Sequence, residues 1–162
     1  MSVSLLARID LTQIYPPFLE RVVGMVEEAR GQGAHFWAIS GFRSYAEQTR
    51  LHEQGRGKPG PIVTNAKAGE SSHNFGIAID FCRDGVVDRR GLQPDWKPES
   101  YFELGEAARN HGLEWGGGWQ FKDNPHVQMT GYVTKAQLEP LRQAFEAGGL
   151  RGVWDFLDKA GQ

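Results

Sequence analysis

The sequence is poor in cysteine and carries little net charge. Cys82 is the only cysteine in 162 residues, so the chain cannot form an internal disulfide or a zinc site closed by several thiolates. Because Cys82 sits in an apolar run, we expect it to be a small buried hydrophobe rather than a reactive thiol. The 18 basic and 20 acidic residues leave a formal charge of -2, which gives no sign of nucleic acid or an anionic membrane as a partner.

Long hydrophobic runs are also missing. No stretch is apolar over the roughly 20 residues that a membrane-spanning helix needs, so we expect no membrane insertion. The N-terminal run Met1–Arg8 is too short and too poor in basic residues for a secretory signal. We therefore predict synthesis in the cytoplasm without a signal peptide. The sequence shows no internal repeat and no linker, and its length fits one domain spanning residues 1–162.

Glycine and tryptophan, by contrast, are plentiful, and 21 glycines with 5 tryptophans suit a loop-rich domain with an aromatic-lined groove. Apolar residues at three- and four-residue steps predict helices that end at glycines. The predicted helices run from Pro16 to Gly31, Tyr45 to Gln54, Tyr101 to His111, Thr134 to Ala147 and Gly149 to Lys159. The predicted strands are His35–Ser40, Ile77–Cys82 and a segment entered near His126, and Asp84–Gly85 predicts a hairpin turn.

The stretch from Ser71 to Asp80 carries the spacing of a metal site. His73 lies seven residues before Asp80, and an imidazole with a carboxylate suits a borderline ion such as zinc. Alternation along the strand places Asp80 on the face opposite Ile77 and Ile79. A carboxylate in so apolar a run is costly unless it is paired or binds a cation. The alternative is an ordinary salt-bridged aspartate beside a loop histidine.

A catalytic zinc site needs a third ligand, and His126 is the best candidate. Pro125 favours extended backbone just before it, and an apolar strand follows, so its setting mirrors that of His73. The remaining histidines have ordinary explanations in a helix, at a helix end or at the start of a strand: His52, His111 and His35. We therefore predict one zinc per chain held by His73, Asp80 and His126, with a fourth position open to water.

A carboxylate close to such an ion can act as a general base. Asp123 is the natural candidate, because it precedes His126 by three residues in a loop that Pro125 stiffens. Glu114 is a rival and Glu70 a weaker third candidate. The alternative reading of Asp123 is a solvated turn residue.

Arg43 follows a predicted strand and precedes a predicted helix. An arginine there can bind a substrate carboxylate or stabilise developing negative charge, although it can equally be an ordinary surface residue. We expect Ser71, Gln48 and Trp115 to contact the substrate.

Taken together, these segments resemble a family of zinc peptidases of peptidoglycan. It includes D-Ala-D-Ala carboxypeptidases, vancomycin-resistance D,D-dipeptidases and phage L-alanyl-D-glutamate endopeptidases. Each block is weak alone, but their order is informative and they span most of the chain. The matching blocks are Ser40-Gly-Phe-Arg-Ser44, Ser71-x-His73-x-x-Gly76-x-Ala78-x-Asp80, and Trp115-Gly-Gly-Gly-Trp119 followed by Asp123-x-x-His126.

The resemblance implies an α+β fold, a small antiparallel sheet flanked by helices, shared with the hedgehog signalling domain. It implies zinc bound by His73, Asp80 and His126, with Asp123 as the catalytic base and Arg43 as the substrate or transition-state contact. The D,D-dipeptidases usually carry glutamate where this chain has Asp123. The aspartate and the Trp-Gly-Gly block resemble the L-alanyl-D-glutamate enzymes instead.

The predicted function is therefore cleavage of the peptidoglycan stem peptide between L-Ala and D-Glu, in the manner of a single-domain phage endolysin without a wall-binding module. Such an enzyme would act on the cell wall, in the periplasm, after release with a holin-type export partner, and we expect a monomer. A D,D-carboxypeptidase or dipeptidase of wall remodelling is the alternative within the same reaction class. A non-catalytic, zinc-binding hedgehog-like module is the alternative from another class.

Overall fold

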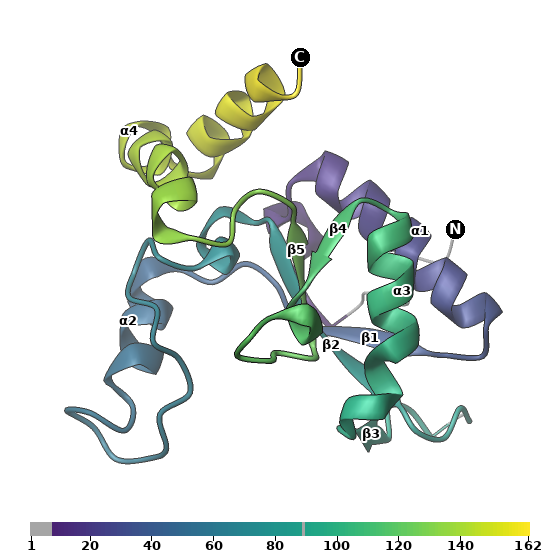
Figure 1. The fold of residues 1–162 in the computed structure, drawn as a ribbon. Helices are drawn as coiled ribbons and strands as arrows, with labels where there is room; N and C mark the ends of the chain where they lie inside the picture. The colour runs from purple at the N-terminus through teal and green to yellow at the C-terminus, as the bar shows by residue number, and fades with distance from the viewer. Residues whose placement is uncertain (1–7, 89) are drawn as a thin grey trace.

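A computed structural model describes residues 8–88 and 90–162 of the chain (Figure 1). The prediction about a signal peptide concerns residues that lie almost wholly outside this part. No helix in the described ranges is long and apolar enough to cross a membrane. The helices are α1 (Pro16–Gly31), α2 (Tyr45–Glu53), α3 (Phe102–Asn110) and α4 (Lys135–Ala160), and the strands are β1 (Phe36–Ser40), β2 (Ala78–Asp84), β3 (Pro94–Asp95), β4 (Leu113–Trp115) and β5 (His126–Met129).

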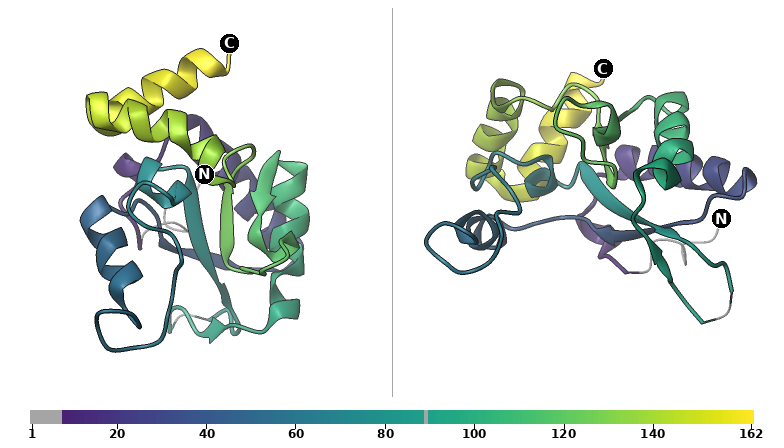
Figure 2. Two further views of the ribbon diagram at one scale, coloured as in Figure 1. Left: turned by 60° about the vertical axis from the view of Figure 1, so that its left-hand side comes forward. Right: turned by 60° about the horizontal axis from the view of Figure 1, so that its bottom comes forward.

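The strands form one antiparallel sheet in the order β1-β2-β5-β4, and β3 pairs with the end of β2. Helices flank it, with α1 and α3 on one side and α2 and α4 on the other (Figures 1 and 2). The predicted α+β fold with a small antiparallel sheet is therefore confirmed. The central strand β2 has a neighbour on each side, and five of its seven residues are buried.

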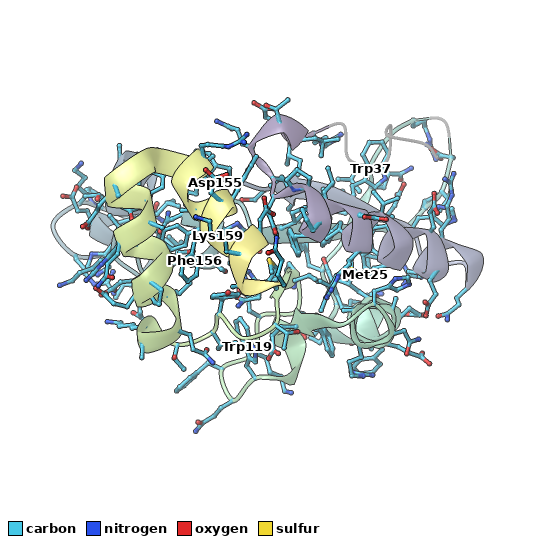
Figure 3. All side chains as sticks on the ribbon, turned by 90° about the horizontal axis from the view of Figure 1, so that it is seen from above. Met25, Trp37, Trp119, Asp155, Phe156 and Lys159 are labelled. Atoms are coloured by element: carbon cyan, nitrogen blue, oxygen red, sulfur yellow. The ribbon has the colours of Figure 1, made fainter. Side chains whose placement is uncertain are left out.

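One face of the sheet is apolar and packs against α1 and α3. Ile79 and Val127 are cross-strand partners on this face, and both are fully buried. Met25 of α1 lies in the layer between α1 and α3 (Figure 3). Burial of this face is the main favourable contribution to folding, because apolar side chains leave water there. The core side chains that the sheet contributes are Phe36, Ala38, Ile79, Phe81, Leu113 and Val127.

The two helices predicted for the tail are present as two segments of α4. Gly148 and Gly149 have non-helical backbone angles, and the helix turns a corner there, as Figure 1 shows. The second segment is tied back to the rest of the fold. Trp154 Nε1 donates to the Phe75 carbonyl at 3.2 Å, and the Tyr15 hydroxyl donates to Asp158 at 2.7 Å.

The hairpin after β2 begins where the sequence predicts, but its connection is longer than a tight turn. The Asp84 carboxylate accepts hydrogen bonds from the amides of Val86 and Gln93, at 3.4 and 3.1 Å. This aspartate therefore closes a loop between β2 and β3, and residue 89 of that loop lies outside the described ranges.

Candidate metal centre

A short 3-10 turn, Ser72–Phe75, positions the first histidine. The Ser71 hydroxyl accepts a hydrogen bond from the His73 amide at 3.3 Å and caps the turn. Gly76 ends it with φ of 71°, a left-handed conformation that favours glycine, and an added Cβ would collide with the Gln13 carbonyl. The turn thus delivers His73 at the edge of β2, and the side chain is 3% exposed.

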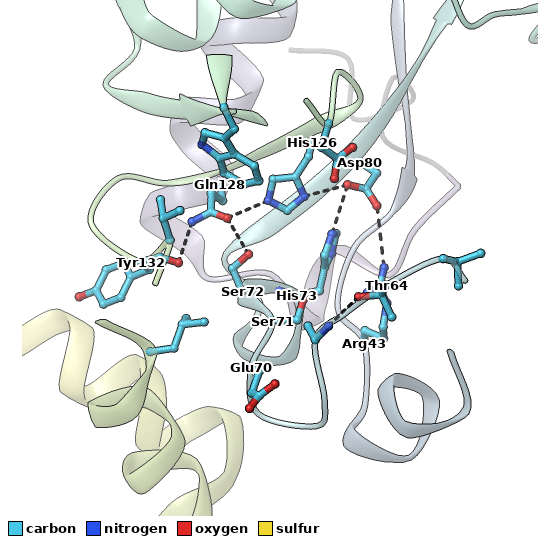
Figure 4. Close-up of a pocket in the computed structure, with 16 residues that line it drawn as sticks. Arg43, Thr64, Glu70, Ser71, Ser72, His73, Asp80, His126, Gln128 and Tyr132 are labelled. Atoms are coloured by element: carbon cyan, nitrogen blue, oxygen red, sulfur yellow. Dashed lines mark hydrogen bonds and ion pairs between the residues drawn. The ribbon is translucent and has the colours of Figure 1, made fainter. Parts of the chain in front are cut away.

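Strand pairing brings the other two side chains to the same place. Asp80 of β2 and His126 of β5 are direct cross-strand partners, on the face opposite Ile79. The Asp80 Oδ1 atom lies 3.0 Å from His126 Nδ1 and 3.2 Å from His73 Nε2 (Figure 4). One ligand atom from each residue falls within a 4.8 Å span. The structure therefore brings together the three residues predicted to bind metal.

Hydrogen bonds fix the orientation of both imidazoles. His73 Nδ1 lies 2.8 Å from the Gly41 carbonyl, and His126 Nε2 lies 2.8 Å from Gln128 Oε1. Since both oxygens are acceptors, each of these nitrogens carries the proton, and the opposite nitrogen is directed at the shared centre. Gln128 is held in turn, because its amide nitrogen donates to the Tyr132 carbonyl at 2.8 Å.

The charges at the centre are strongly coupled. Burial alone would raise the pKa of the Asp80 carboxyl, but the neighbouring imidazoles of His73 and His126 outweigh it and hold that pKa far below its usual range. For His126, burial opposes the charged form, yet the hydrogen bond and negative charge of Asp80 raise its pKa. The cluster thus favours an ionised carboxylate beside positive charge.

A cavity of about 360 Å³ opens on this cluster. Asp123 lies in its wall together with the three clustered residues, and the connection that carries it is fixed by a hydrogen bond from its amide to the Gly116 carbonyl at 3.0 Å. Partial desolvation in the cavity wall raises the pKa of Asp123, although the residue as a whole is exposed; His126 opposes the shift and Asp80 adds to it. The other side chains in the wall are Arg43, Val63, Thr64, Ala66, Glu70, Ser71, Ser72, Trp119, Gln128, Tyr132, Val133 and Leu138.

The rival carboxylates are engaged elsewhere. Glu114 accepts a hydrogen bond from Trp119 Nε1 at 2.8 Å and is not part of the cavity wall. Glu70 is in the wall, but it pairs with Lys135 at 3.1 Å and accepts the Lys67 amide at 2.9 Å. Asp123 is therefore the candidate base in the cavity wall whose carboxylate forms no ion pair among the described residues, and the charges of His126 and Asp80 act on it.

Arg43 enters the cavity beside Asp80. Its guanidinium lies 3.9 Å from Asp80 Oδ2, and its backbone amide donates to the His73 carbonyl at 3.0 Å. Gln48, which the sequence places in contact with substrate, lies beneath Arg43 instead. It is fully buried, accepts from Arg43 at 3.0 Å and donates to the Ala66 carbonyl at 2.8 Å. Both ends of the Gln48 side-chain amide are thus hydrogen-bonded within the protein, so Gln48 supports the Arg43 side chain and is not part of the cavity wall.

Trp115, which the sequence analysis expects to contact the substrate, is also not part of the cavity wall. It pairs with Val127 across β4 and β5, on the apolar face, where its ring packs against Gly105 of α3. Its indole donates to the Asn124 carbonyl at 2.8 Å, which helps to hold the connection between β4 and β5 in place. The tryptophan in the cavity wall is Trp119, whose ring centroid lies 5.2 Å from that of His126.

The other histidines lie outside the cluster, and His111 pairs with Glu28 at 2.9 Å. Gln128 was missed by the sequence analysis. The signal was available, because Gln128 follows His126 by two residues in a strand and so shares its face.

The chain is similar to known proteins over most of its length. A family profile described as D-alanyl-D-alanine carboxypeptidase, of peptidase family M15, matches residues 64–129. The chain is 37% identical over 129 residues to the peptidoglycan L-alanyl-D-glutamate endopeptidase CwlK of Bacillus subtilis strain 168, covering 73% of this chain and 74% of CwlK.

Two solved structures share the fold. One is the L-Ala D-Glu endopeptidase ChiX of Serratia marcescens, 26% identical, with a TM-score of 0.53 over 74% of this chain and 83% of ChiX. The other is the vancomycin resistance D,D-pentapeptidase VanY in complex with Zn(II), 17% identical, with a TM-score of 0.51 over 78% of this chain and 76% of VanY. With the sequence identity to CwlK extending over about three quarters of both chains, this protein belongs to the M15 family of peptidases.

Proposed function

We propose that the protein is a zinc-dependent endopeptidase that cleaves the peptidoglycan stem peptide between L-Ala and D-Glu. The observation that carries the proposal is the convergence of His73, Asp80 and His126 within 4.8 Å, at a cavity whose wall also contains Asp123 and Arg43. The choice of bond is supported by CwlK and ChiX, which are both L-Ala-D-Glu endopeptidases by name.

The donor set fits zinc. Two neutral imidazole nitrogens and one carboxylate oxygen are the ligand types that Zn²⁺ accepts, and three protein ligands are the number found in catalytic sites. The hydrogen bonds to Gly41 and Gln128 leave one nitrogen of each imidazole free to bind a cation. When bound, the ion supplies Lewis acidity, which acidifies water and makes the scissile carbonyl more electrophilic.

Asp123 provides the proton transfers of the proposed hydrolysis. Its carboxylate accepts a proton from the attacking water while the water oxygen adds to the L-Ala carbonyl carbon. The same group then gives that proton to the departing amine of D-Glu as the C–N bond breaks. The raised pKa of Asp123 suits this double role, because a carboxyl that holds its proton more readily accepts it more readily from water.

Arg43 binds negative charge in this scheme. D-Glu is joined to the next stem residue through its side-chain carboxyl, so its α-carboxylate is free and adjacent to the scissile nitrogen. A guanidinium can hold such a carboxylate through two parallel hydrogen bonds. Gln48 keeps the Arg43 side chain extended toward Asp80 by accepting one of its N–H groups at 3.0 Å.

A second candidate function is D,D-carboxypeptidase activity, favoured by the family description that matches residues 64–129. Mass spectrometry of muropeptides digested with the purified protein separates the two, in parallel reactions with and without a chelator. New N-terminal D-Glu is expected. Release of terminal D-Ala alone would refute the endopeptidase assignment.

A non-catalytic zinc module is the third candidate, and the cavity argues against it. A structural site would need neither the carboxylate of Asp123 nor the guanidinium of Arg43 in the wall of a cavity beside the cluster. Wall-lysing activity that persisted in Asp123→Ala would overturn the mechanism given above.

The setting we propose is that of a phage-type endolysin: one catalytic domain over residues 1–162, monomeric, and reaching the wall with a holin-type partner. The resemblance of its sequence blocks to single-domain phage enzymes supports this setting. A bacterial remodelling enzyme is the alternative, supported by the identity to CwlK of a bacterium. Rapid lysis of outer-membrane-permeabilised cells by the added protein is expected for an endolysin, and slow trimming without lysis for a remodelling enzyme.

A further inference from the structure

The connection between β4 and β5 presents an apolar side chain to solvent next to the site. Phe121 is 87% exposed, the largest exposure among the exposed large hydrophobic side chains of the described residues. It follows Trp119 by two residues and precedes Asp123 by two, and both of these neighbours lie in the cavity wall. Figure 3 shows Trp119 on this connection, on the side of the molecule away from α1.

The exposure of Phe121 is not that of a loose loop. The Gly116 carbonyl accepts the amides of Trp119 and Asp123 at 3.2 and 3.0 Å, which closes the connection on itself. Lys122 Nζ donates to the Gly117 carbonyl at 3.1 Å on the far side of Phe121. A phenyl ring in water on a braced backbone costs solvation free energy, and a ligand that covered the ring would recover it.

The proposed substrate carries a sugar close to the bond that is cleaved. In peptidoglycan the L-Ala amine is joined through a lactyl group to N-acetylmuramic acid, so one amino acid separates the scissile bond from the sugar. At about 3.5 Å per residue of extended chain, the sugar begins roughly 7–10 Å from the scissile carbon. For a D,D-carboxypeptidase the same sugar would be several residues farther away.

The position of Arg43 indicates on which side the sugar lies. Arg43 approaches Asp80 from its Oδ2 oxygen, whereas Trp119 packs against His126, which bonds the Oδ1 oxygen. With the D-Glu carboxylate at Arg43, the acyl part of the substrate would extend the other way, toward Trp119, which Phe121 follows by two residues.

We propose that Phe121, two residues beyond Trp119 on the braced connection, is a platform for the N-acetylmuramic acid sugar that carries the stem peptide. The axial C–H groups of a pyranose ring form an apolar face, which packs on an aromatic ring and leaves water with it. This inference rests on the proposed function, since it requires the sugar to lie one residue from the cleaved bond.

The test compares two substrates that differ only in the sugar. One is the disaccharide tripeptide N-acetylglucosaminyl-N-acetylmuramyl-L-Ala-D-Glu-diaminopimelate, and the other is N-lactoyl-L-Ala-D-Glu-diaminopimelate, which keeps the lactyl group and the blocked amine. The quantity measured is the ratio of kcat/KM for the two substrates. We expect Phe121→Ala to lower this ratio about tenfold, the effect of removing one aromatic contact.

Two further variants serve as controls. Phe121→Tyr keeps the ring and should keep the ratio of the wild-type enzyme. Phe102→Ala removes another exposed phenylalanine, 63% exposed and located on α3 behind the sheet, and should also keep it. A ratio unaltered in Phe121→Ala, or equally lowered in Phe102→Ala, would overturn the platform. Failure of the wild-type enzyme to release N-terminal D-Glu from either substrate would instead overturn the proposed function.

Discussion

The two faces of the sheet are built from the same strands and yet do different work. On one face Ile79 and Val127 pair in the hydrophobic core. The next pair in the ladder, Asp80 and His126, lies on the other face of the sheet, at the cavity. The apolar face derives its stability from packing, whereas the polar face derives its order from hydrogen bonds to groups that lie behind the imidazoles.

This difference means that the two faces should fail in different ways. Loss of a side chain on the apolar face should lower the free energy of unfolding, because a cavity is left in a close-packed core. Loss of a side chain on the polar face should remove metal or chemistry from a protein that still folds.

The largest effect is expected from removing the metal. Chelation, or His126→Ala on the polar face, should reduce activity to background while circular dichroism still reports a folded protein. Zinc added back after chelation should restore wild-type activity but not that of His126→Ala. Full activity in a preparation with no measurable metal would contradict the assignment.

Next in size is the loss of the base. Asp123→Asn keeps the shape of the side chain and removes its proton affinity, so kcat should fall by about 10²- to 10⁴-fold. Zinc content should remain at one ion per chain, because Asp123 is outside the ligand cluster. Steady-state kinetics with metal analysis checks both, and a loss of zinc in step with activity would make Asp123 a ligand instead.

The apolar face is tested by Phe81→Ala. Phe81 is fully buried in the core, so we expect the free energy of unfolding to fall by about 3–5 kcal/mol. The fraction that remains folded should bind zinc as the wild-type protein does. Denaturant titration and metal analysis of the folded fraction decide the matter, and selective loss of zinc without loss of stability would show that the two faces are not separable.

Gln128 tests whether the hydrogen bonds of the polar face matter for metal binding, because it holds the imidazole of His126. Gln128→Ala removes the acceptor that fixes His126, and we expect zinc affinity to fall about 10- to 100-fold. Gln128→Glu retains an acceptor oxygen and should lose less. Competition with a zinc-binding dye measures the affinity, and equal losses in the two variants would exclude a role for the acceptor.

The smallest effect concerns pH and the metal-free protein. The folded-state pKa of Asp80 is depressed, so its contribution to stability is present above about pH 3.9 and is lost as the pH falls through the folded value. The folded-state pKa of His126 is raised, so its contribution is complete below about pH 6.5 and is lost as the pH rises through the folded value.

The melting temperature of the metal-free protein should therefore be highest between about pH 4 and 6.5 and should fall by a few degrees toward pH 8. The melting temperature of the zinc-loaded protein should instead rise between about pH 6.5 and 8, because protons compete with zinc for the histidines at lower pH. In metal-free Asp80→Asn the trend should be absent, and the same trend in all three proteins would assign it to other groups.

The metal cluster and the order of the elements could be predicted from the sequence, because successive side chains of a strand point to opposite faces of the sheet. The two-residue period separates Asp80 from Ile79, and the glycines mark the ends of the helices. The roles of Gln48 and Trp115 could not be read in this way. Whether a helix residue reaches a cavity or supports another side chain depends on tertiary packing, as does the contact between His73 and a backbone carbonyl that has no sequence signature.

The hydrogen bond from Trp154 to the Phe75 carbonyl connects the second segment of α4 to the turn that carries His73. The second segment of α4, beyond Gly149, contacts the turn that carries His73. The two residues joined by the hydrogen bond, Trp154 and Phe75, are 79 positions apart in sequence. Truncation of the chain at Gly149 should therefore loosen the turn that carries His73 and weaken metal binding, although it removes none of the three clustered residues.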